Sequence, residues 1–422
     1  MSDPEWLDLT QHVRPGDVVT WGQACSEPRA LSRLLVEQAD RIGELTCFVG
    51  IPAGSSLTVD TVGSIDAVSY CGSGTNAAMH AADRLRILPV HYSTLPDLLG
   101  SGALRADVVL VQVSPADDEG YHWMGLADDY FAGTVETARV VLAEVNPHVP
   151  RTPDARRLHR DSLAAVVHSD EVPGQMPTPP VDETTRAVAR RVASLVPDGA
   201  TLQFGIGALP EAVLAELREH RDLGIHSGIL NDTAMDLVRS GVATGAWKTH
   251  DRGIAVAGLL GGSAELFAWA DRNQGLALRS TRYTHDAEIL RTSYRMTAIN
   301  AAIEVDLTGQ VNAEVAAGRY VGAVGGAMDF LRGAAGSPGG VPIVALPSVA
   351  RGASRIVAAL NGPVSTPRAE QIVVVTEHGV ADLRGLTTDQ RIERMIAIAH
   401  PDHRTELDAE AESALASAGS RP

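Results

Sequence analysis

A glutamate and a histidine, Glu377 and His378, directly follow a β-branched run in the segment IVVVTEHGVADLRG (372–385). Such a run is typical of a buried strand, and parallel sheets bind their ligands at the carboxyl ends of their strands. A carboxylate at that place costs several kcal/mol unless it is paired. The segment therefore predicts either a structural ion pair at Glu377 or a group that works in the site.

The segment TLQFGIGALPEAV (201–213) has the composition of an anion-binding turn. Gly205 and Gly207 permit a tight turn after a strand, and Pro210 suits the first position of a helix. Free N–H groups at a helix start can hold an anion or the negatively charged oxygen of a reacting carbonyl. An ordinary strand-to-helix turn would explain the same residues.

A second glycine-rich segment, YVGAVGGAMDFLRGAAGSPGG (320–340), contains the pairs Gly325-Gly326 and Gly339-Gly340 around an apolar stretch. Glycine pairs let the backbone approach a flat or bulky ligand closely. Loop flexibility in a glycine-rich chain is the alternative explanation.

The elements that must position these loops are short β-branched runs, each followed by a Gly- or Asp-containing loop and a helical pattern. The runs show little alternation of apolar and polar residues, which favours parallel strands buried on both faces. Repeated strand–helix units of this kind predict an α/β protein with open, mostly parallel sheets. The clearest examples are residues 107–121, 138–152, 200–217 and 371–385.

A division of the chain is indicated at HSDEVPGQMPTPPVDETT (168–185), which is rich in proline and acidic residues. We interpret it as a linker that precedes a helix from about Thr184 to Leu195. The predicted domains are residues 1–180 and 181–422, each long enough for its own core.

Composition excludes several classes of partner. The 422 residues include 35 Lys and Arg against 52 Asp and Glu, a formal charge of −17, which argues against nucleic acid or an anionic membrane surface. No stretch of 18 apolar residues predicts a membrane span. Three cysteines without CxxC spacing indicate reduced thiols, and the 14 histidines show no metal-binding motif. We expect a cytoplasmic protein without a metal.

Taken together and in this order, ten segments resemble the acetyl-CoA hydrolase/transferase family, and in particular its 4-hydroxybutyrate and acetate CoA-transferases. The resemblance implies two α/β domains of the CoA-transferase type with the active site between them, and a homodimer or higher oligomer. It implies an acyl-CoA thioester and a small-molecule acceptor as substrates, with no bound cofactor. The segments are GQACSEP (22–28), SPADDEGY (114–121), AEVNPHVPRT (143–152), GATLQFGIGALPEAVL (199–214), LGIHS (223–227), AIEVDLTGQVNAE (302–314), VGGAMDFLRGA (324–334), SRIV (354–357), VVTEHGVADLRG (374–385) and IAHPDHRTEL (398–407).

The mechanism that the resemblance implies is covalent catalysis by a glutamate carboxylate. The carboxylate attacks the thioester, the resulting anhydride captures CoA as a glutamyl thioester, and CoA then passes to an incoming carboxylate. Backbone amides of the glycine-rich loop stabilise the developing oxyanion.

This chain departs from the family pattern at the catalytic centre. After LGIHS the family has the glutamate, whereas this chain has Gly228, so no glutamyl anhydride can form there. The family pattern SGVGGQ corresponds here to residues 322–327, with Ala323 in place of a glycine and Ala327 in place of the glutamine.

These changes predict direct acyl transfer from an acyl-CoA, or a related pantetheine thioester, to an amine, hydroxyl or water. Gly325 and Gly326 would supply the oxyanion donors, with Glu377 or His226 as the general base. Two alternatives stay open: an ordinary carboxylate CoA-transferase with a displaced nucleophile, and a non-catalytic acyl-CoA-binding protein. The predicted substrate-binding residues are Gly205, Gly207, Ala323, Gly325, Gly326 and Ala327.

Overall fold

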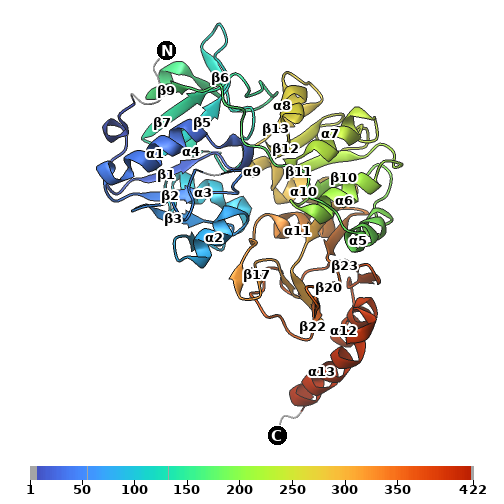
Figure 1. Ribbon diagram of the computed structural model, residues 1–422. Helices are drawn as coiled ribbons and strands as arrows, with labels where there is room; N and C mark the ends of the chain where they lie inside the picture. The colour runs from blue at the N-terminus through green and yellow to red at the C-terminus, as the bar shows by residue number, and fades with distance from the viewer. Residues whose placement is uncertain (1–6, 55, 132, 420–422) are drawn as a thin grey trace.

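The computed structural model describes residues 7–54, 56–131 and 133–419. It contains two large sheets, one in each half of the chain, which lie beside each other in Figure 1. The prediction of an α/β protein with mostly parallel sheets is confirmed. The last strand of the first sheet ends at His168 and the next helix begins at Glu183, on either side of the predicted division.

The N-terminal sheet has seven strands in the order β4-β3-β2-β1-β5-β7-β9, and all its pairings are parallel. Its central strands, with the sequences VVLVQV and VVLAEV, are buried at every residue, as strands covered on both faces must be. The strands are β1 (Val18–Trp21), β2 (Thr46–Val49), β3 (Asp66–Ser69), β4 (Arg86–Ile87), β5 (Val108–Val113), β7 (Val140–Val145) and β9 (Ala165–His168).

The C-terminal sheet has eight strands in the order β13-β12-β11-β10-β14-β19-β23-β24. Its pairings are parallel except at the edge, where β24 turns back along β23. The strands are β10 (Thr201–Phe204), β11 (Gly224–Leu230), β12 (Ala255–Leu260), β13 (Leu276–Leu278), β14 (Met296–Ala301), β19 (Val341–Ala345), β23 (Val373–Thr376) and β24 (Gly379–Asp382).

Short strands outside the two sheets shape the loops around them. They are β6 (Tyr121–Trp123) with β8 (Arg157–His159), β15 (Glu304–Asp306) with β16 (Val311–Asn312) and β22 (Ile356–Val357), β17 (Val315–Ala316) with β18 (Arg319–Tyr320), and β20 (Val349–Ala350) with β21 (Ala353–Ser354).

Helices connect the strands, and the last one, α13, extends away from both sheets in Figure 1. They are α1 (Arg29–Ile42), α2 (Thr75–Ala81), α3 (Leu95–Gly100), α4 (Thr134–Thr137), α5 (Glu183–Ala193), α6 (Ala208–Glu216), α7 (Asp232–Arg239), α8 (Ala264–Ala270), α9 (Thr281–Thr284), α10 (Ala287–Thr292), α11 (Ala327–Gly336), α12 (Thr388–Ile398) and α13 (Pro401–Gly419). Short 3-10 turns occur at Leu9–Gln11, Ala24–Ser26, Tyr92–Thr94 and Arg160–Ser162.

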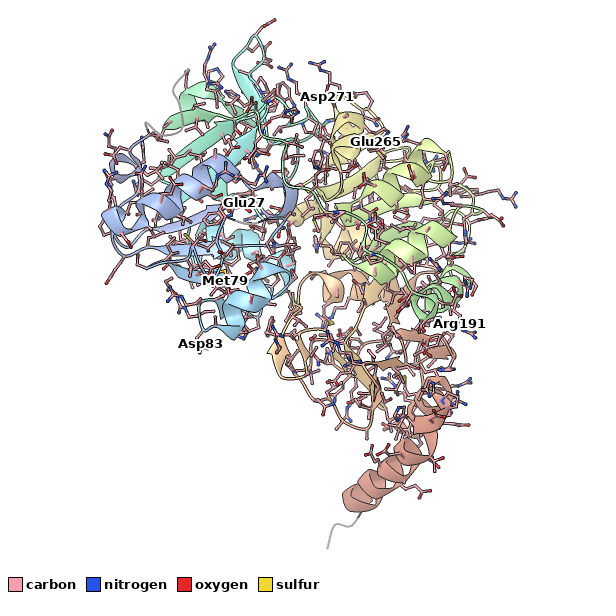
Figure 2. All side chains as sticks on the ribbon, in the orientation of Figure 1. Glu27, Met79, Asp83, Arg191, Glu265 and Asp271 are labelled. Atoms are coloured by element: carbon pink, nitrogen blue, oxygen red, sulfur yellow. The ribbon has the colours of Figure 1, made fainter. Side chains whose placement is uncertain are left out.

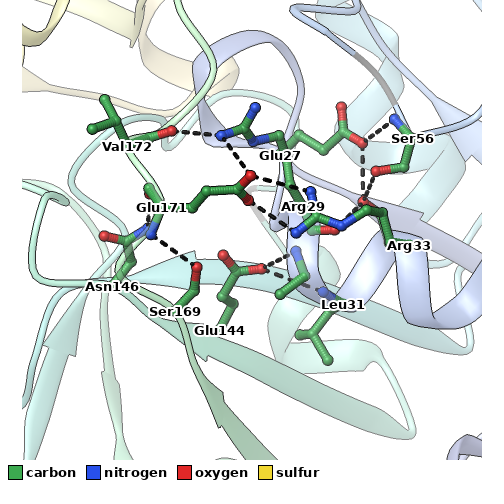
Figure 3. Close-up of polar contacts among 12 residues, drawn as sticks. Glu27, Arg29, Leu31, Arg33, Ser56, Glu144, Asn146, Ser169, Glu171 and Val172 are labelled. Atoms are coloured by element: carbon green, nitrogen blue, oxygen red, sulfur yellow. Dashed lines mark hydrogen bonds and ion pairs between the residues drawn. The ribbon is translucent and has the colours of Figure 1, made fainter. Parts of the chain in front are cut away.

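The start of α1 is held by buried carboxylates (Figure 3). Glu144 of β7 accepts hydrogen bonds from the N–H groups of Ala30 at 2.7 Å and Leu31 at 3.3 Å. These amides have no partner within the helix, so the carboxylate replaces a helix cap. Glu27 accepts from the N–H of Ser56 at 2.9 Å in the same cluster. Both carboxylates therefore stabilise the fold through hydrogen bonds to backbone N–H groups.

One of the buried hydrophobic clusters spans the two halves. Cys25 and Leu126 of the N-terminal half belong to the same buried cluster as Ile229 and Leu259 of the C-terminal half. Backbone hydrogen bonds also cross the junction, because the N–H of Leu260 donates to the carbonyl oxygen of Leu126 at 2.8 Å. The junction is therefore packed closely enough to place residues of both halves in one site.

Candidate active site

A cavity of about 340 Å³, here called the central cavity, lies between the two halves. The C-terminal ends of β10, β11 and β14 contribute to its wall, as expected for the ligand side of a parallel sheet. Of the described residues that line it, none is an Asp, Glu, Lys or Arg. Its polar groups are those of Gln23, Tyr70, Tyr92, Gln203, His285 and Asn300, with Cys71 and Ser73 near them.

Gly228 lies in β11 and lines the central cavity. A Cβ atom placed there would lie 3.4 Å from His285 Cε1 and 4.0 Å from Phe330 Cε2, which is ordinary contact, and the backbone is not in the left-handed region. Neither crowding nor strain requires a glycine at this position. A Cβ atom would therefore be accommodated at this position in the wall of the cavity.

The loop of residues 322–327 forms another wall and is held by the N-terminal half. The N–H of Gly72 donates to the carbonyl oxygen of Gly322 at 2.7 Å, and the N–H of Tyr92 donates to that of Gly325 at 3.0 Å. Gly325 has φ +57°, a left-handed conformation that favours glycine. The position of this loop thus depends on both halves of the chain.

The structure brings the predicted loop residues together. Ala323, Gly325, Gly326 and Ala327 all line the central cavity. The backbone of Gly325 pairs with that of His91 in an isolated parallel bridge, and Gly326 immediately precedes the first turn of α11. The N–H groups of the first turn of a helix favour negative charge, so the start of α11 could stabilise an oxyanion here.

The two glycines of the first predicted turn lie apart. Gly205 lines the central cavity at the end of β10. Gly207 does not line it; with φ +123° it forms the start of α6. Beside Gly205, Gln203 and Asn300 exchange side-chain hydrogen bonds of 3.3 and 3.1 Å and present an amide pair to the cavity.

His285 is a cavity residue that sequence reasoning missed. It follows α9, and its ring packs against Tyr92 and Phe330 with ring centroids 5.0 and 4.5 Å apart. Its Nδ1 is 2.9 Å from the hydroxyl of Thr284. Burial lowers the pKa of His285 to about 3, so the ring is neutral at pH 7. No motif or spacing marks this histidine in the sequence.

A buried polar cluster supports the N-terminal wall of the cavity. Gln23 donates from Nε2 to the hydroxyl oxygen of Tyr92 at 2.5 Å and to the carboxyl group of Asp129 at 2.8 Å, and it accepts from the hydroxyl of Tyr70 at 2.7 Å. Burial raises the pKa of Asp129 to about 7. Burial also raises the pKa of both tyrosines well above 10, so they stay protonated. The wall therefore presents neutral hydrogen-bonding groups.

The two predicted bases lie outside the lining of the central cavity. Glu377 accepts from the N–H of Ser348 at 2.8 Å and from its hydroxyl at 2.6 Å, as a structural anchor does. His226 is fully buried; its Nε2 is 3.1 Å from the carbonyl oxygen of Thr284, and burial lowers its pKa to about 4. A catalytic role for either residue stays a prediction.

A larger cavity, of about 510 Å³, opens elsewhere along the junction, near Asp271 (Figure 2). It is lined by Arg151 and Arg272 among others and shares no lining residue with the central cavity. Across the described residues there is no cluster of three or more His, Cys, Asp or Glu that could hold a metal ion. The described helices include none long and apolar enough to cross a membrane.

Two family models match the chain. The acetyl-CoA hydrolase/transferase N-terminal domain matches residues 5–175, and the C-terminal domain of the same family matches residues 262–411. The second match includes the loop of residues 322–327 and His285, whereas Gly228 lies between the two matches.

Among characterised relatives, the chain is similar to the 4-hydroxybutyrate coenzyme A transferase of Clostridium kluyveri, with 37% identity over 342 residues and 80% of each protein covered. It is also similar to the butyryl-CoA:acetate CoA-transferase of Anaerostipes caccae, with 31% identity over 425 residues, 95% of this chain and 94% of the relative.

Solved structures resemble the whole chain. RipA from Yersinia pestis has a TM-score of 0.90 at 32% identity, with 98% of this chain and 97% of that one covered. A 4-hydroxybutyrate CoA-transferase from Porphyromonas gingivalis has a TM-score of 0.80 at 33% identity, with 96% of each chain covered.

Proposed function

The chain belongs to the acetyl-CoA hydrolase/transferase family and is an acyl-CoA-dependent transferase, and we propose that it passes the acyl group directly to an uncharged nucleophile. The donor is a coenzyme A thioester or a related pantetheine thioester. The acceptor is an amine, an alcohol or water, and no glutamyl-CoA intermediate forms.

One observation carries this proposal: the central cavity contains Gly228 and no carboxylate among its described lining residues. Covalent transfer of CoA between two carboxylates needs an enzyme carboxylate within bonding distance of the thioester carbon. The cavity also lacks a Lys or Arg among those residues to balance the charge of a carboxylate acceptor. An uncharged acceptor avoids the cost of burying an unpaired charge there.

The reaction needs an oxyanion site, and the loop of Gly325 and Gly326 with the first turn of α11 borders the central cavity where that site would lie. As the acceptor attacks the thioester carbon, negative charge develops on the carbonyl oxygen. Preorganised N–H groups stabilise that charge more strongly than they stabilise the neutral thioester, which lowers the barrier.

Transfer of CoA between carboxylates is the second candidate, because relatives at 30–37% identity are named as carboxylate CoA-transferases. It requires a displaced nucleophile, and no described lining residue of the central cavity is a carboxylate. The two candidates differ in whether the protein becomes covalently modified.

The test is incubation of the purified protein with acetyl-CoA or butyryl-CoA and a panel of amines, alcohols and carboxylates. We expect repeated release of free CoA with an uncharged acceptor, an acyl-acceptor product in the mass spectrum, and no borohydride-sensitive adduct on the protein. A glutamyl- or aspartyl-CoA adduct during turnover would refute direct transfer. Release of no CoA with any acceptor would favour a binding protein.

Family membership supports three further expectations that belong to this proposal: a homodimer, a cytoplasmic location and the absence of a bound cofactor. Light scattering of the purified protein measures the first, fractionation of cells the second, and native mass spectrometry the third.

A further inference from the structure

We propose that His285 is the catalytic base of the direct transfer, because its Nε2 atom lies beside Gly228, in the space where an incoming nucleophile would meet the thioester. The inference rests on the proposed function and names the group that accepts the nucleophile's proton.

The position of the ring edge follows from the two glycines next to it. A Cβ atom on Gly228 would lie 3.7 Å from His285 Nε2, and a Cβ atom on Gly326 would lie only 2.4 Å from it. Nε2 therefore occupies the gap between the end of β11 and the oxyanion loop. A thioester carbonyl bound to the amides of that loop would lie within reach of a nucleophile held by Nε2.

The hydrogen bonds of the ring leave Nε2 free to accept a proton. The hydroxyl of Thr284 donates to the carbonyl oxygen of Ser280 at 3.3 Å, which leaves its oxygen to accept from Nδ1–H of His285 at 2.9 Å. We assign the Nδ1–H tautomer on that basis. No described residue forms a hydrogen bond with Nε2.

Packing holds the ring in one orientation. Phe330 of α11 and Tyr92 of the N-terminal half contact it from two further elements. The titratable groups next to it, Tyr92 and His226, are both uncharged at neutral pH, because burial raises the pKa of Tyr92 well above 10 and lowers that of His226 to about 4. The base is thus neutral and oriented before the substrate binds, and the negative charge that develops on the substrate favours its protonated form.

The step balances without any further reactant. The nucleophile H–Nu gives its proton to Nε2 while its electron pair forms the bond to the thioester carbon, and the C=O electron pair moves to oxygen. When the C=O bond re-forms, the C–S bond breaks and the departing thiolate takes the proton from Nε2. The products are R–CO–Nu and HS–CoA, and His285 returns to its neutral state.

The experiment compares His285→Asn with His250→Asn in the full chain. Asparagine can keep the hydrogen bond to Thr284 but has no atom at Nε2. His250 is the control, because one of its ring nitrogens, Nε2, bonds a threonine hydroxyl (Thr292 at 2.8 Å) as Nδ1 of His285 bonds Thr284, and it does not line the central cavity. His285→Gln, which returns a polar but non-basic group near Nε2, is a second variant in case His285→Asn folds poorly.

For both His285 variants we expect kcat to fall about 100-fold with little change in KM for the thioester, since general-base catalysis contributes on the order of 10²–10⁴-fold. The rate should vary little between pH 5 and 8 when His285 is intact and Asp129→Asn is present in all the proteins compared, since Asp129, beneath the cavity, has a pKa of about 7. The rate of the variants should rise steeply with pH, because hydroxide must then remove the proton. His250→Asn should match the wild type.

The outcomes separate the two proposals. Wild-type turnover with an unchanged kcat and pH profile in the His285 variants would overturn the role of His285 and leave direct transfer intact. Absence of wild-type turnover with every acceptor would overturn both. Nitrogen NMR of ¹⁵N-histidine-labelled protein gives a readout without activity: a hydrogen on Nε2 of His285 in the free protein would also contradict the inference.

Discussion

Two buried regions of this protein differ in their carboxylates: the start of α1 has two, and the described lining of the central cavity has none. At the start of α1, Glu27 and Glu144 are buried; Glu144 accepts hydrogen bonds from the N–H groups of Ala30 and Leu31, and Glu27 accepts from the N–H of Ser56 and the hydroxyl of Ser32 (Figure 3). In the central cavity, the wall includes the start of α11, and no described lining residue is a carboxylate.

A hydrogen bond from an N–H group to a negatively charged oxygen can stabilise a fold or a reaction, and the two regions illustrate these two roles. A buried acid that meets enough donors stabilises the fold, because the donors replace its lost hydration. Donors that meet no acid are costly for the fold and retain their capacity for a charge that develops during a reaction. In this chain the carboxylates at the start of α1 have hydrogen-bond donors. No described residue that lines the central cavity offers a carboxylate to the N–H groups there.

Supplying the missing acid should have the largest effect. In Gly228→Glu the added Cβ meets only ordinary contacts, so the side chain can enter the cavity. We expect CoA exchange between carboxylates to rise by about 1,000-fold or more, because removal of a catalytic nucleophile from an intact site costs at least that much. A glutamyl-CoA adduct in the mass spectrum and acetate-dependent exchange measure it. Gly228→Gln, which has the shape without the nucleophile, should show neither.

Crowding the oxyanion loop comes next. In Gly326→Ala the new methyl group would lie 2.4 Å from Nε2 of His285, so the ring or the loop must move. We expect a fall of about 100-fold in kcat for direct transfer, comparable to the loss of an oxyanion donor. Gly336→Ala, at the other end of α11, should retain most of the wild-type rate. Equal rates for the two variants would place the reaction elsewhere.

Removing an acid from the other region should affect stability and leave catalysis alone. Glu144→Ala leaves the N–H groups of Ala30 and Leu31 buried without an acceptor. We expect the free energy of unfolding to fall by about 3 kcal/mol, with kcat per folded molecule unchanged. Glu171→Ala removes a neighbouring, more exposed ion pair with Arg33 and should cost less than about 1 kcal/mol. Denaturant unfolding measures both.

Asp129 has features of both regions, because it is buried beneath the cavity with one oxygen unpaired. Its pKa of about 7 in the folded state lies above the ordinary value of 3.8, so the folded protein holds this proton more tightly than the unfolded chain. The stability from this group is present below about pH 4 and is lost as pH rises towards 7. We expect Asp129→Asn to gain on the order of 2 kcal/mol over the wild type between pH 4 and 8. A constant difference in melting temperature across that range would contradict the assignment.

Glu377→Gln should have the smallest effect on catalysis. The carboxylate is bonded to Ser348 and lies outside the described lining of the central cavity. We expect kcat to change by less than about threefold, with a lower melting temperature. A loss of 100-fold with an unchanged KM would restore Glu377 as the general base and remove that role from His285.

Much of the fold could be predicted from local patterns. The β-branched runs within residues 107–121 and 138–152 predict buried parallel strands, which the structure contains as β5 (Val108–Val113) and β7 (Val140–Val145). The helix expected from about Thr184 to Leu195 is α5, from Glu183 to Ala193. These features are local, because strand burial and helix capping depend on residues close together in the chain.

The site could be predicted only in part. The glycine-rich loop and Gly228 were identified from the family resemblance, and the structure places both in one cavity. The same resemblance suggested Glu377 and His226 as bases, but their distances from the reacting space depend on how distant loops fold. Asn300 and Gln23, which also line the cavity, come from opposite halves of the chain, and nothing in the sequence near either residue predicts that they share a cavity.

By itself, the sequence determined the family, the parallel α/β sheets and the absence of a side chain at residue 228. Only the tertiary structure decided that His285 stands beside that glycine and that Glu377 is occupied by Ser348. The physical reason is the sequence separation of the residues that interact. Residue type and short-range periodicity can be read along the chain, whereas the approach of Nε2 to Gly228 depends on the packing of α9 and His285 against β11, α11 and the N-terminal half.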